Sequence, residues 1–371
     1  MFFSSLRTAS FRNLHDHETL TAAKDIFLVG ENGQGKTNFL EAVYFCAYAS
    51  SFRTAHESEM ARNGEKDFSA EAKIAQSVND DILVKFENGK KSILINGKPA
   101  EDRRELLSVA PCIVFCHEDM EFVNGSPERR RWFFDQTLSL YDPIYLDDLR
   151  RYKKVLKSRN AALKDFSRLP FLEKSKTSGS VEQILDALDT QFLMYGQKLI
   201  EKRETAAKQF SEVFSSLYEE VSGIAGINVQ YNRSWKEDPA SQLLEKRAAD
   251  MAAGLSLCGP HRDRYVFAHN ETEFTGKAST GQKRLLALLL RTAQAKRFSK
   301  MTGQNPVLLL DDVLLEMDGE KRRRFLSVMP SYDQAFYTFL PEEPYKHYSS
   351  YPEETLIYNV ENGQLMSRSK T

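Results

Sequence analysis

Residues 26–37 read IFLVGENGQGKT, a short apolar run that leads directly into the spacing G-x-x-x-x-G-K-[ST]. The apolar residues predict a buried strand, and the glycines let the following backbone turn tightly enough for its N–H groups to face phosphate oxygens. A lysine at this position brings a compact positive charge to the β- and γ-phosphates, and the hydroxyl after it can bind Mg²⁺. The stretch therefore predicts a nucleotide site for ATP and Mg²⁺ made by Gly30, Glu31, Asn32, Gly33, Gln34, Gly35, Lys36 and Thr37.

Residues 38–48 carry apolar side chains at helical spacing directly after this loop. A helix here would direct its positive N-terminal end toward the phosphates. Taken alone, the stretch could also be a glycine-rich turn between a strand and a helix with no ligand.

The composition is that of a globular protein, with 371 residues, 41% hydrophobic residues and a formal net charge of -1. The near-neutral charge argues against a surface that is basic all over, but it leaves local basic patches possible. No uncharged apolar run is long enough to cross a membrane, and the first residues lack the pattern of a signal peptide, so we expect a cytoplasmic protein. Cys112 and Cys116 lie close to His117, which suggests zinc, but without a second pair we favour buried structural cysteines.

The rest of the chain alternates between strand-like and helical stretches. Strands are expected near residues 3–11, in a meander over residues 67–98 with a turn at 87–90, and at residues 112–116. A long helical region begins at Pro127 and breaks over residues 167–180. A second amphipathic helix over residues 185–217, roughly 50 Å long, would complete an antiparallel hairpin.

A second candidate site segment is the apolar strand at residues 307–310, which ends in two carboxylates. A buried strand needs no charge at its end, whereas a nucleotide site of this type needs an acid near Mg²⁺. We expect Asp311 to bind the metal with Thr37, directly or through water, and Asp312 to act as the base for the attacking water. Alone, the pair could equally be a strand that ends in a solvated turn.

A third segment, Ser279-Thr280-Gly281-Gln282, stands directly before a helical run at residues 285–298. Small residues with a hydroxyl and exposed N–H groups at a helix start can bind an anion, and by themselves they can also be a simple helix cap. The order of the three segments resembles that of ATP-binding-cassette ATPases. In those proteins the serine-glycine segment of one subunit closes on the γ-phosphate held by another.

Nearly the whole chain is similar to the RecF family, bacterial recombination and gap-repair ATPases related to SMC proteins. Besides the segments above, the resemblance rests on residues 11–13 (FRN), 37–42 (TNFLEA), 51–54 (SFRT), 125–131 (GSPERRR) with Asp135, 152–160 (YKKVLKSRN) and 259–263 (GPHRD). It implies an α/β fold, an ABC/SMC-type P-loop ATPase head with an inserted antiparallel helical arm domain. The head would comprise residues 1–123 and 221–371, and the arm residues 124–220.

The resemblance also implies a function. It suggests a weak ATPase that dimerises on ATP, with the nucleotide between the P-loop of one copy and Ser279, Gly281 and Gln282 of the other. Lys36 and Asp312 would be the catalytic residues. The family implies binding to single-strand/double-strand DNA junctions and work with RecR and RecO to load RecA, with slow hydrolysis that drives release.

The first arm segment, residues 150–176, carries ten basic residues and only two acids. One face of such a helix could neutralise several phosphates, although most charge runs are simply solvated helix faces. With the family resemblance we expect DNA contacts from Arg150, Arg151, Lys153, Lys154, Lys157 and Arg159. Among Arg129, Arg130 and Arg131, we expect at least one to pair with Asp135 or Glu128.

Three other protein classes share some of these motifs. The ATPase subunit of a membrane transporter would carry a switch histidine after the last strand, where Thr338 stands here. A structural SMC-type tether would need arms several times longer. A nucleotide kinase would share the P-loop but would not need the segment at residues 279–282.

Overall fold

The computed structural model describes residues 2–75, 80–100, 102, 104–314, 317, 319–343, 345 and 354–368, and the chain forms two compact units. The head unit is Met1–Asp119 with Leu290–Thr371, and the arm unit is Met120–Leu289. The first crossing lies close to the expected boundary after residue 123, but the return to the head lies at Leu290 rather than at residue 221. The physical reason is that the strands after residue 221 pack on the long arm helix, as described below.

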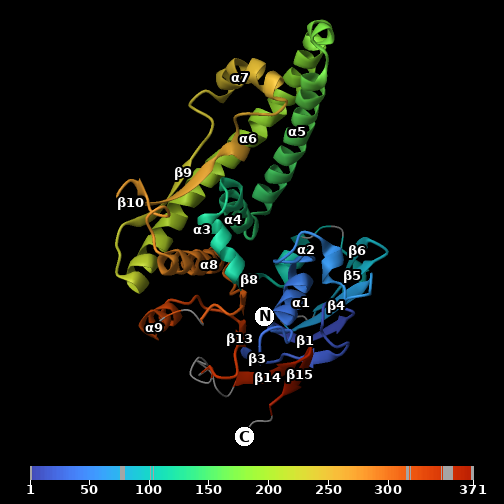
Figure 1. Ribbon diagram of the computed structural model, residues 1–371, viewed down its shortest axis with the longest axis vertical. Helices are drawn as coiled ribbons and strands as arrows, with labels where there is room; N and C mark the ends of the chain where they lie inside the picture. The colour runs from blue at the N-terminus through green and yellow to red at the C-terminus, as the bar shows by residue number, and fades with distance from the viewer. Residues whose placement is uncertain are drawn as a thin grey trace. The chain divides into compact units, whose positions relative to one another are not determined.

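The head unit is built on a six-stranded sheet in the order β15-β14-β3-β13-β12-β8 (Figure 1). All neighbouring strands are parallel except β15, and β3, β13, β12 and β8 are buried along their whole length. Continuous apolar runs form such strands because both faces of a parallel sheet are covered. The bounds are β3 Asp25–Val29, β8 Cys112–Phe115, β12 Val307–Leu310, β13 Gln334–Phe339, β14 Thr355–Glu361 and β15 Gln364–Ser367.

A second, antiparallel sheet of the head unit has the order β2-β1-β4-β5-β6-β7. The expected turn at residues 87–90 is present, with φ of 52° at Asn88 and 72° at Gly89, values that Asn and Gly adopt readily. The bounds are β1 Phe2–Ala9, β2 Glu18–Leu20, β4 Phe68–Ala75, β5 Asp80–Glu87, β6 Lys90–Ile95 and β7 Lys98–Pro99.

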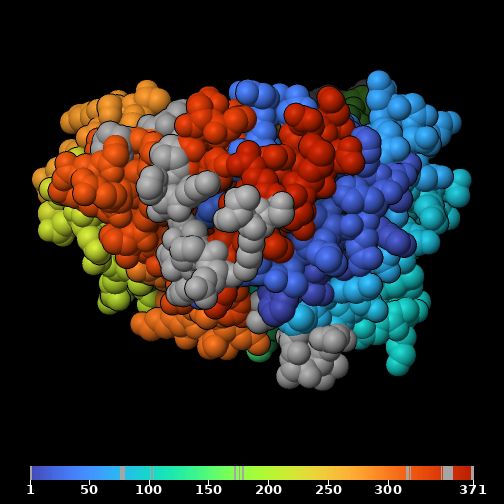
Figure 2. Space-filling model, turned by 90° about the horizontal axis from the view of Figure 1, so that it is seen from below, coloured from blue at the N-terminus to red at the C-terminus, as the bar shows by residue number. Residues whose placement is uncertain are grey.

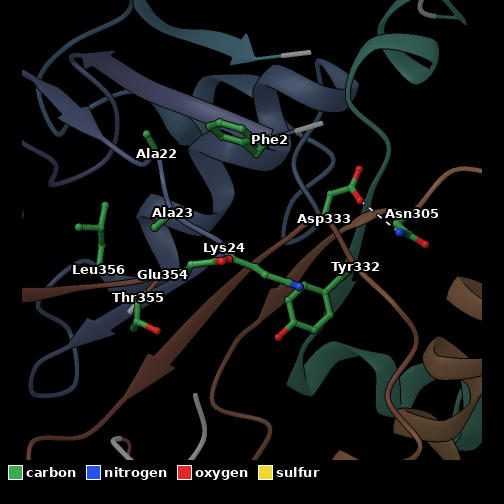
Figure 3. A pocket seen from close by; sticks show the side chains of 10 residues that line it. All are labelled: Phe2, Ala22, Ala23, Lys24, Asn305, Tyr332, Asp333, Glu354, Thr355 and Leu356. Atoms are coloured by element: carbon green, nitrogen blue, oxygen red, sulfur yellow. Dashed lines mark hydrogen bonds between the residues drawn. The ribbon is translucent and has the colours of Figure 1, made fainter. Parts of the chain in front are cut away.

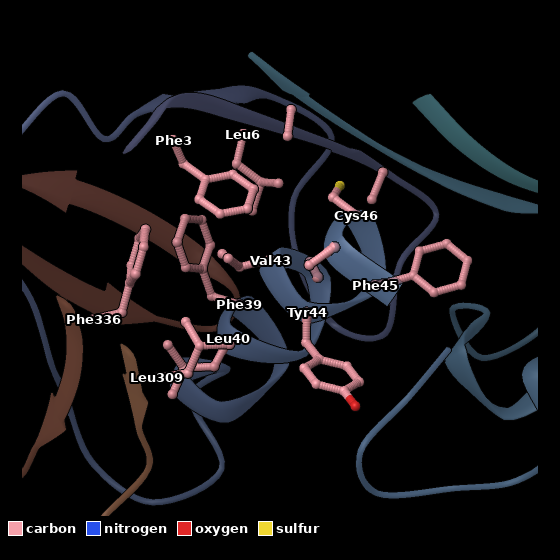
Figure 4. Packing of buried hydrophobic residues seen from close by; sticks show 14 of the residues in the cluster. Phe3, Leu6, Phe39, Leu40, Val43, Tyr44, Phe45, Cys46, Leu309 and Phe336 are labelled. Atoms are coloured by element: carbon pink, nitrogen blue, oxygen red, sulfur yellow. The ribbon is translucent and has the colours of Figure 1, made fainter. Parts of the chain in front are cut away.

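Helix α1 (Lys36–Tyr48) lies between these two sheets and forms the centre of the head core. Figure 4 shows Phe39 on the side of Phe336 from the parallel sheet, with ring centroids 6.3 Å apart. On its other side, Phe45 packs against Phe68 of the antiparallel sheet at 5.3 Å. Because it is covered from both sides, the helix that follows the glycine-rich loop is fixed in position.

The first and last segments of the chain lie together in the head unit (Figure 2). Strand β14 pairs with β3, and the Tyr358 hydroxyl donates a 2.5 Å hydrogen bond to the Leu20 carbonyl. The head unit also contains α2 Arg104–Val109, α9 Gly319–Ser327 and the short 3-10 turns η1 Glu57–Met60 and η2 His117–Asp119.

The arm unit is dominated by two antiparallel helices, α5 (Pro143–Arg168) and α6 (Phe171–Ser222). Tyr152 of α5 stacks on Phe192 of α6, with ring centroids 5.1 Å apart. The break expected over residues 167–180 is wrong, because only Leu169 and Pro170 separate the helices. Serine and glycine at an exposed helix start cost little enough to be accommodated, and α6, with 52 residues, is therefore roughly 78 Å long.

The remaining arm elements pack along α6. Phe267 of β10 contacts Phe214 of α6 with centroids 6.3 Å apart, and the Val229 N–H of β9 donates to the Ser211 hydroxyl at 2.9 Å. These elements are α3 Met120–Asn124, α4 Pro127–Ser139, β9 Ile227–Asn232, α7 Pro239–Ala253, η3 Pro260–Arg262, β10 Arg264–His269 and β11 Thr272–Glu273. Helix α8 (Thr280–Thr302) begins in the arm unit and continues into the head unit. Within the described residues, every helix is too short or too polar to span a bilayer.

Candidate functional site

The glycine-rich loop joins the buried end of β3 to α1, and its glycines are needed for two different reasons. Gly33 and Gly35 have φ values of 79° and 116°, which side chains other than glycine rarely adopt. Gly30 is needed because β14 crowds it, since a Cβ there would lie 2.4 Å from the Val360 carbonyl oxygen. The loop is held from outside by Asn362, whose N–H donates to the Gln34 side chain at 2.7 Å.

Lys36 lies inside the curl of this loop. Its Nζ donates hydrogen bonds to the carbonyls of Gly30 at 2.6 Å and Glu31 at 3.1 Å, and the residue is 4% exposed. The lysine is thus positioned at the base of the cradle, where a phosphate oxygen could replace or share these carbonyl partners. Glu31 and Asn32 are exposed at the rim of the loop.

The two carboxylates after β12 lie at the same sheet edge as the glycine-rich loop. The Thr37 hydroxyl donates to Asp311 Oδ1 at 2.9 Å. The Thr338 Oγ1 lies 3.2 Å from Asp311 Oδ1 and 2.9 Å from Asp312 Oδ1, and it accepts the Asp312 N–H at 2.8 Å. Thr338, which stands where a transporter ATPase would have its switch histidine, therefore orients both acids.

These residues fit a divalent cation. Burial, together with the neighbouring charge of Asp312, raises the pKa of Asp311 to about 6, and a bound cation would offset both effects. A threonine hydroxyl and a carboxylate are the oxygen ligands that Mg²⁺ binds beside nucleotide phosphates. The expected metal ligands Thr37 and Asp311 are thus brought together.

The segment at residues 279–282 forms the start of α8 in the arm unit. The Ser279 N–H donates to Gln282 Oε1 at 2.8 Å, and the Gln282 N–H donates to Ser279 Oγ at 3.3 Å, which is a reciprocal capping box. The segment is therefore a helix cap, as one of the two interpretations from the sequence predicts. Ser279 and Gly281 are nevertheless exposed, and a Cβ on Gly281 would meet nothing within 4 Å, so the segment can still accept a ligand.

The basic residues of α5 divide into two groups. Arg150, Arg151, Lys153, Lys154 and Lys157 are exposed. Arg159 is fully buried, and its guanidinium donates to Asp189 at 2.7 Å, to Asp250 at 2.8 Å and to the Ser256 hydroxyl at 2.7 Å. The prediction that Arg159 contacts DNA is wrong for this structure, because its charge is already used inside the arm.

A second buried network in the arm unit was missed by sequence reasoning. Arg203 of α6 donates to Asp135 at 3.0 Å and to Asp263 at 2.9 Å. The ion pair of Asp135 thus comes from α6, while Arg131 of its own helix donates to the Asp263 carbonyl at 2.8 Å. The motifs at residues 125–131 and 259–263 were the available signal, but Arg203 lies outside both.

The cysteines are buried, and burial raises the pKa of both Cys112 and Cys116, as expected for structural thiols.

A cavity of about 620 Å³ opens at the amino ends of β3, β13 and β14, the sheet edge opposite the loop. Figure 3 shows Lys24 and Tyr332 among the residues that line this cavity.

A P-loop, an apolar strand ending in two acids beside it and a capped serine-glycine helix start define an ABC/SMC-type P-loop ATPase. The family model "RecF/RecN/SMC N terminal domain" matches residues 2–351. The chain is 40% identical over 362 residues to the DNA replication and repair protein RecF of Treponema pallidum, covering 95% of this chain and 98% of the relative. This chain belongs to the RecF family.

Other comparisons agree with this assignment. The DNA replication and repair protein RecF of Clostridium kluyveri is 31% identical over 374 residues, covering 98% of this chain and 99% of the relative. A solved structure of the recombination mediator protein RecF with ATP in the RecFOR pathway has a TM-score of 0.86 at 25% identity, and it covers 99% of this chain and 98% of that one. An Smc head domain from Pyrococcus furiosus shares the fold, with a TM-score of 0.52 at 16% identity. The fold class and family expected from the sequence are confirmed.

Proposed function

We propose that this chain is an ATP-switched DNA-binding protein of the RecFOR pathway. The single observation that carries the proposal is the hydrogen bond from Thr37 to Asp311, which joins the P-loop helix to the strand with the acids. Relatives named for DNA replication and repair, and a RecF structure solved with ATP, support the ligand and the biological setting.

ATP would bind with its phosphates in the loop formed by residues 30–35, against Lys36 and Thr37. Bound at Thr37 and Asp311, Mg²⁺ would supply positive charge to the β- and γ-phosphates. Asp312, oriented by Thr338, accepts a proton from the attacking water, and Lys36 stabilises the charge on the leaving group. We propose that turnover is slow, so that hydrolysis resets the switch.

Closure requires a second copy of the chain in this proposal. Ser279, Gly281 and Gln282 of one copy contact the γ-phosphate held by the P-loop of the other, which makes dimerisation dependent on ATP. The exposed helix start supports this role, because the positive end of α8 attracts an anion.

The exposed cations of α5 would contact the DNA backbone, giving binding that depends on salt and not on sequence. DNA with a single-strand/double-strand junction is the substrate we propose, with RecR and RecO as partners and RecA as the protein loaded. Such a protein works in the cytoplasm.

The test is ATP-dependent binding to gapped DNA by the wild type and by Lys36→Met. We expect wild-type binding to strengthen with ATP and Mg²⁺ and to weaken steeply with salt. The variant should lose the ATP effect, because the buried ammonium at the base of the loop is gone. Wild-type binding that ignores both ATP and salt would refute the proposal.

A further inference from the structure

Three of the motifs that carry the family resemblance meet at one buried carboxylate. Glu41 of α1 is 0% exposed. It accepts Arg12 Nε at 2.9 Å and Arg12 Nη2 at 3.0 Å, and it also accepts the Ser51 hydroxyl. Arg53 Nη1 lies 3.5 Å from Glu41 Oε2. The motifs at residues 11–13, 37–42 and 51–54 are therefore joined through a single side chain.

Each of the two arginines is connected to the P-loop, one through the next residue in the chain and the other through hydrogen bonds. Arg12 is followed by Asn13, whose Nδ2 donates to the Gly33 carbonyl at 3.3 Å. Arg53 donates to Asn38 Oδ1 at 2.8 Å, and Asn38 Nδ2 donates to Asn13 Oδ1 at 2.7 Å. Both routes from Glu41 thus end at the amide of Asn13.

Asn13 lies against Gly35, the glycine directly before Lys36. A Cβ built on Gly35 would be 3.0 Å from Asn13 Oδ1, so this amide packs directly on the backbone that precedes Lys36. Moving Asn13 would remove the support of Gly33 and Gly35, whose N–H groups face the phosphates in the proposed nucleotide complex.

The backbone conformation of Arg12 is unfavourable and has to be held by contacts of its side chain. Its φ is 48°, a left-handed conformation that an arginine rarely adopts, and a bidentate charge-assisted pair can hold it there. The turn at Arg53 is also tied to Glu41, because the Ser51 hydroxyl accepts the N–H groups of Arg53 at 2.9 Å and Thr54 at 3.1 Å. Glu41 therefore fixes both segments from which the asparagine cluster is built.

We propose that Glu41 is the positioning residue of the nucleotide site, acting on the P-loop through Arg12, Arg53 and the Asn13 amide. Without its charge, two guanidiniums face each other across an uncharged group, and the segments at residues 11–13 and 51–54 separate. The loop then binds phosphate less tightly, although no atom of Glu41 contacts the ligand. This inference rests on the proposed ATP site.

The experiment is a double-mutant cycle on ATP affinity, measured by calorimetry with Mg²⁺ on wild type, Glu41→Gln, Asn13→Ala and the double variant. Each single variant should weaken binding roughly five- to tenfold, and the double variant no more than the weaker-binding single. Losses that multiply, or a Glu41→Gln protein that binds like the wild type, would overturn the role of Glu41. A wild type that does not bind ATP would instead remove the proposed function itself.

A merely structural Glu41 would lower the thermal midpoint and leave affinity unchanged. Lys91→Gln is the matched control, since it breaks an ion pair with Glu57 elsewhere in the head unit, at 2.6 Å, and should not change ATP affinity. If Glu41→Gln does not fold, Arg53→Ala replaces it in the same cycle, because this exposed arginine provides one of the two routes to Asn13. Additive losses in that cycle would likewise contradict the proposal.

Discussion

Thr37 and Asp311 are 274 residues apart in the chain and are joined by a hydrogen bond of 2.9 Å. The threonine is the second residue of α1, and the aspartate directly follows β12, which β13 separates from β3. This contact places a hydroxyl and a carboxylate where one cation could touch both and a nucleotide phosphate.

Asp311→Asn should separate metal binding from nucleotide binding. The amide keeps the shape but removes the charge, so we expect ATP to bind with little benefit from Mg²⁺ and hydrolysis to fall by about a hundredfold or more. Asp312→Asn should retain the Mg²⁺ effect and lose hydrolysis to a similar extent. Titration of ATP affinity against Mg²⁺, with phosphate release measured alongside, distinguishes the two, and identical behaviour of both variants would contradict their assigned roles.

Ser279→Arg should block the ATP-dependent dimer. A long charged side chain at the exposed helix start would occupy the space of the γ-phosphate and remove the cap to Gln282. Sedimentation with ATP and Mg²⁺ measures the dimer directly. Ser279→Ala is the control for the cap alone, and a Ser279→Arg protein that dimerises as well as the wild type would show that closure in trans is wrong.

Replacement of Lys153, Lys154 and Lys157 by glutamate should weaken DNA binding and flatten its salt dependence. Each lost phosphate contact should lower the slope of log affinity against log salt by about 1. Lys98→Glu on β7 is an exposed control in the head unit. Equal salt slopes for the wild type and the triple variant would exclude this face of α5 as the DNA contact.

Replacement of Arg159, on the same helix, should reduce stability and leave DNA binding unchanged. Arg159→Ala would take the Arg159 cation from buried Asp250, while Asp189 keeps its pair with Arg247, and the loss costs about 3–5 kcal/mol of stability. We expect a large drop in the urea midpoint, and no change in salt slope for the fraction that stays folded. A stable Arg159→Ala protein with a reduced slope would restore this residue to the DNA surface.

His261 should make the arm sensitive to acid. Burial, together with nearby arginines, lowers its pKa to about 4. Its Nε2–H donates to the Ser256 carbonyl at 3.0 Å, and its Nδ1 accepts the Tyr152 hydroxyl at 2.8 Å, so the neutral ring is the form that fits. Between pH 6.5 and 4 the unfolded chain binds a proton that the folded chain does not, and stability is lost as the pH falls through this window.

The measurement is urea unfolding at several pH values for the wild type and His261→Gln. Glutamine can make both hydrogen bonds but cannot titrate, so the variant should lose less stability on acidification, by up to roughly 3 kcal/mol. His56→Gln, at an exposed position, should follow the wild type. Parallel curves for wild type and His261→Gln would show that another group controls the acid response.

The sequence predicted those parts of the site that depend on local spacing. Lys36 and Thr37 follow a fixed loop length, and Asp311 follows an apolar strand, so their roles could be stated before any contact was known. The contacts of Glu41 could not be predicted from the sequence, because Arg12 and Arg53 come from segments that only the folded head unit brings together.

Arg159 shows where the available pattern was misinterpreted. It falls on the same helical stripe as Tyr152, Val155, Leu163 and Phe166, all of them buried. That spacing favours an inward position, but the density of positive charge around it favoured the surface. The length of α6 was underestimated for a related reason, since serine and glycine residues were taken as a break although α6 continues through them.

The pairing of β3 has a consequence for the order in which the protein can fold during synthesis. Both sheet neighbours of this early strand, β13 and β14, belong to the last part of the chain, and the P-loop itself is clamped by Asn362. A ribosome therefore produces the nucleotide loop long before the strands that support it. The arm unit can assemble first, while the ATP site takes shape only after β13 and β14 have been synthesised.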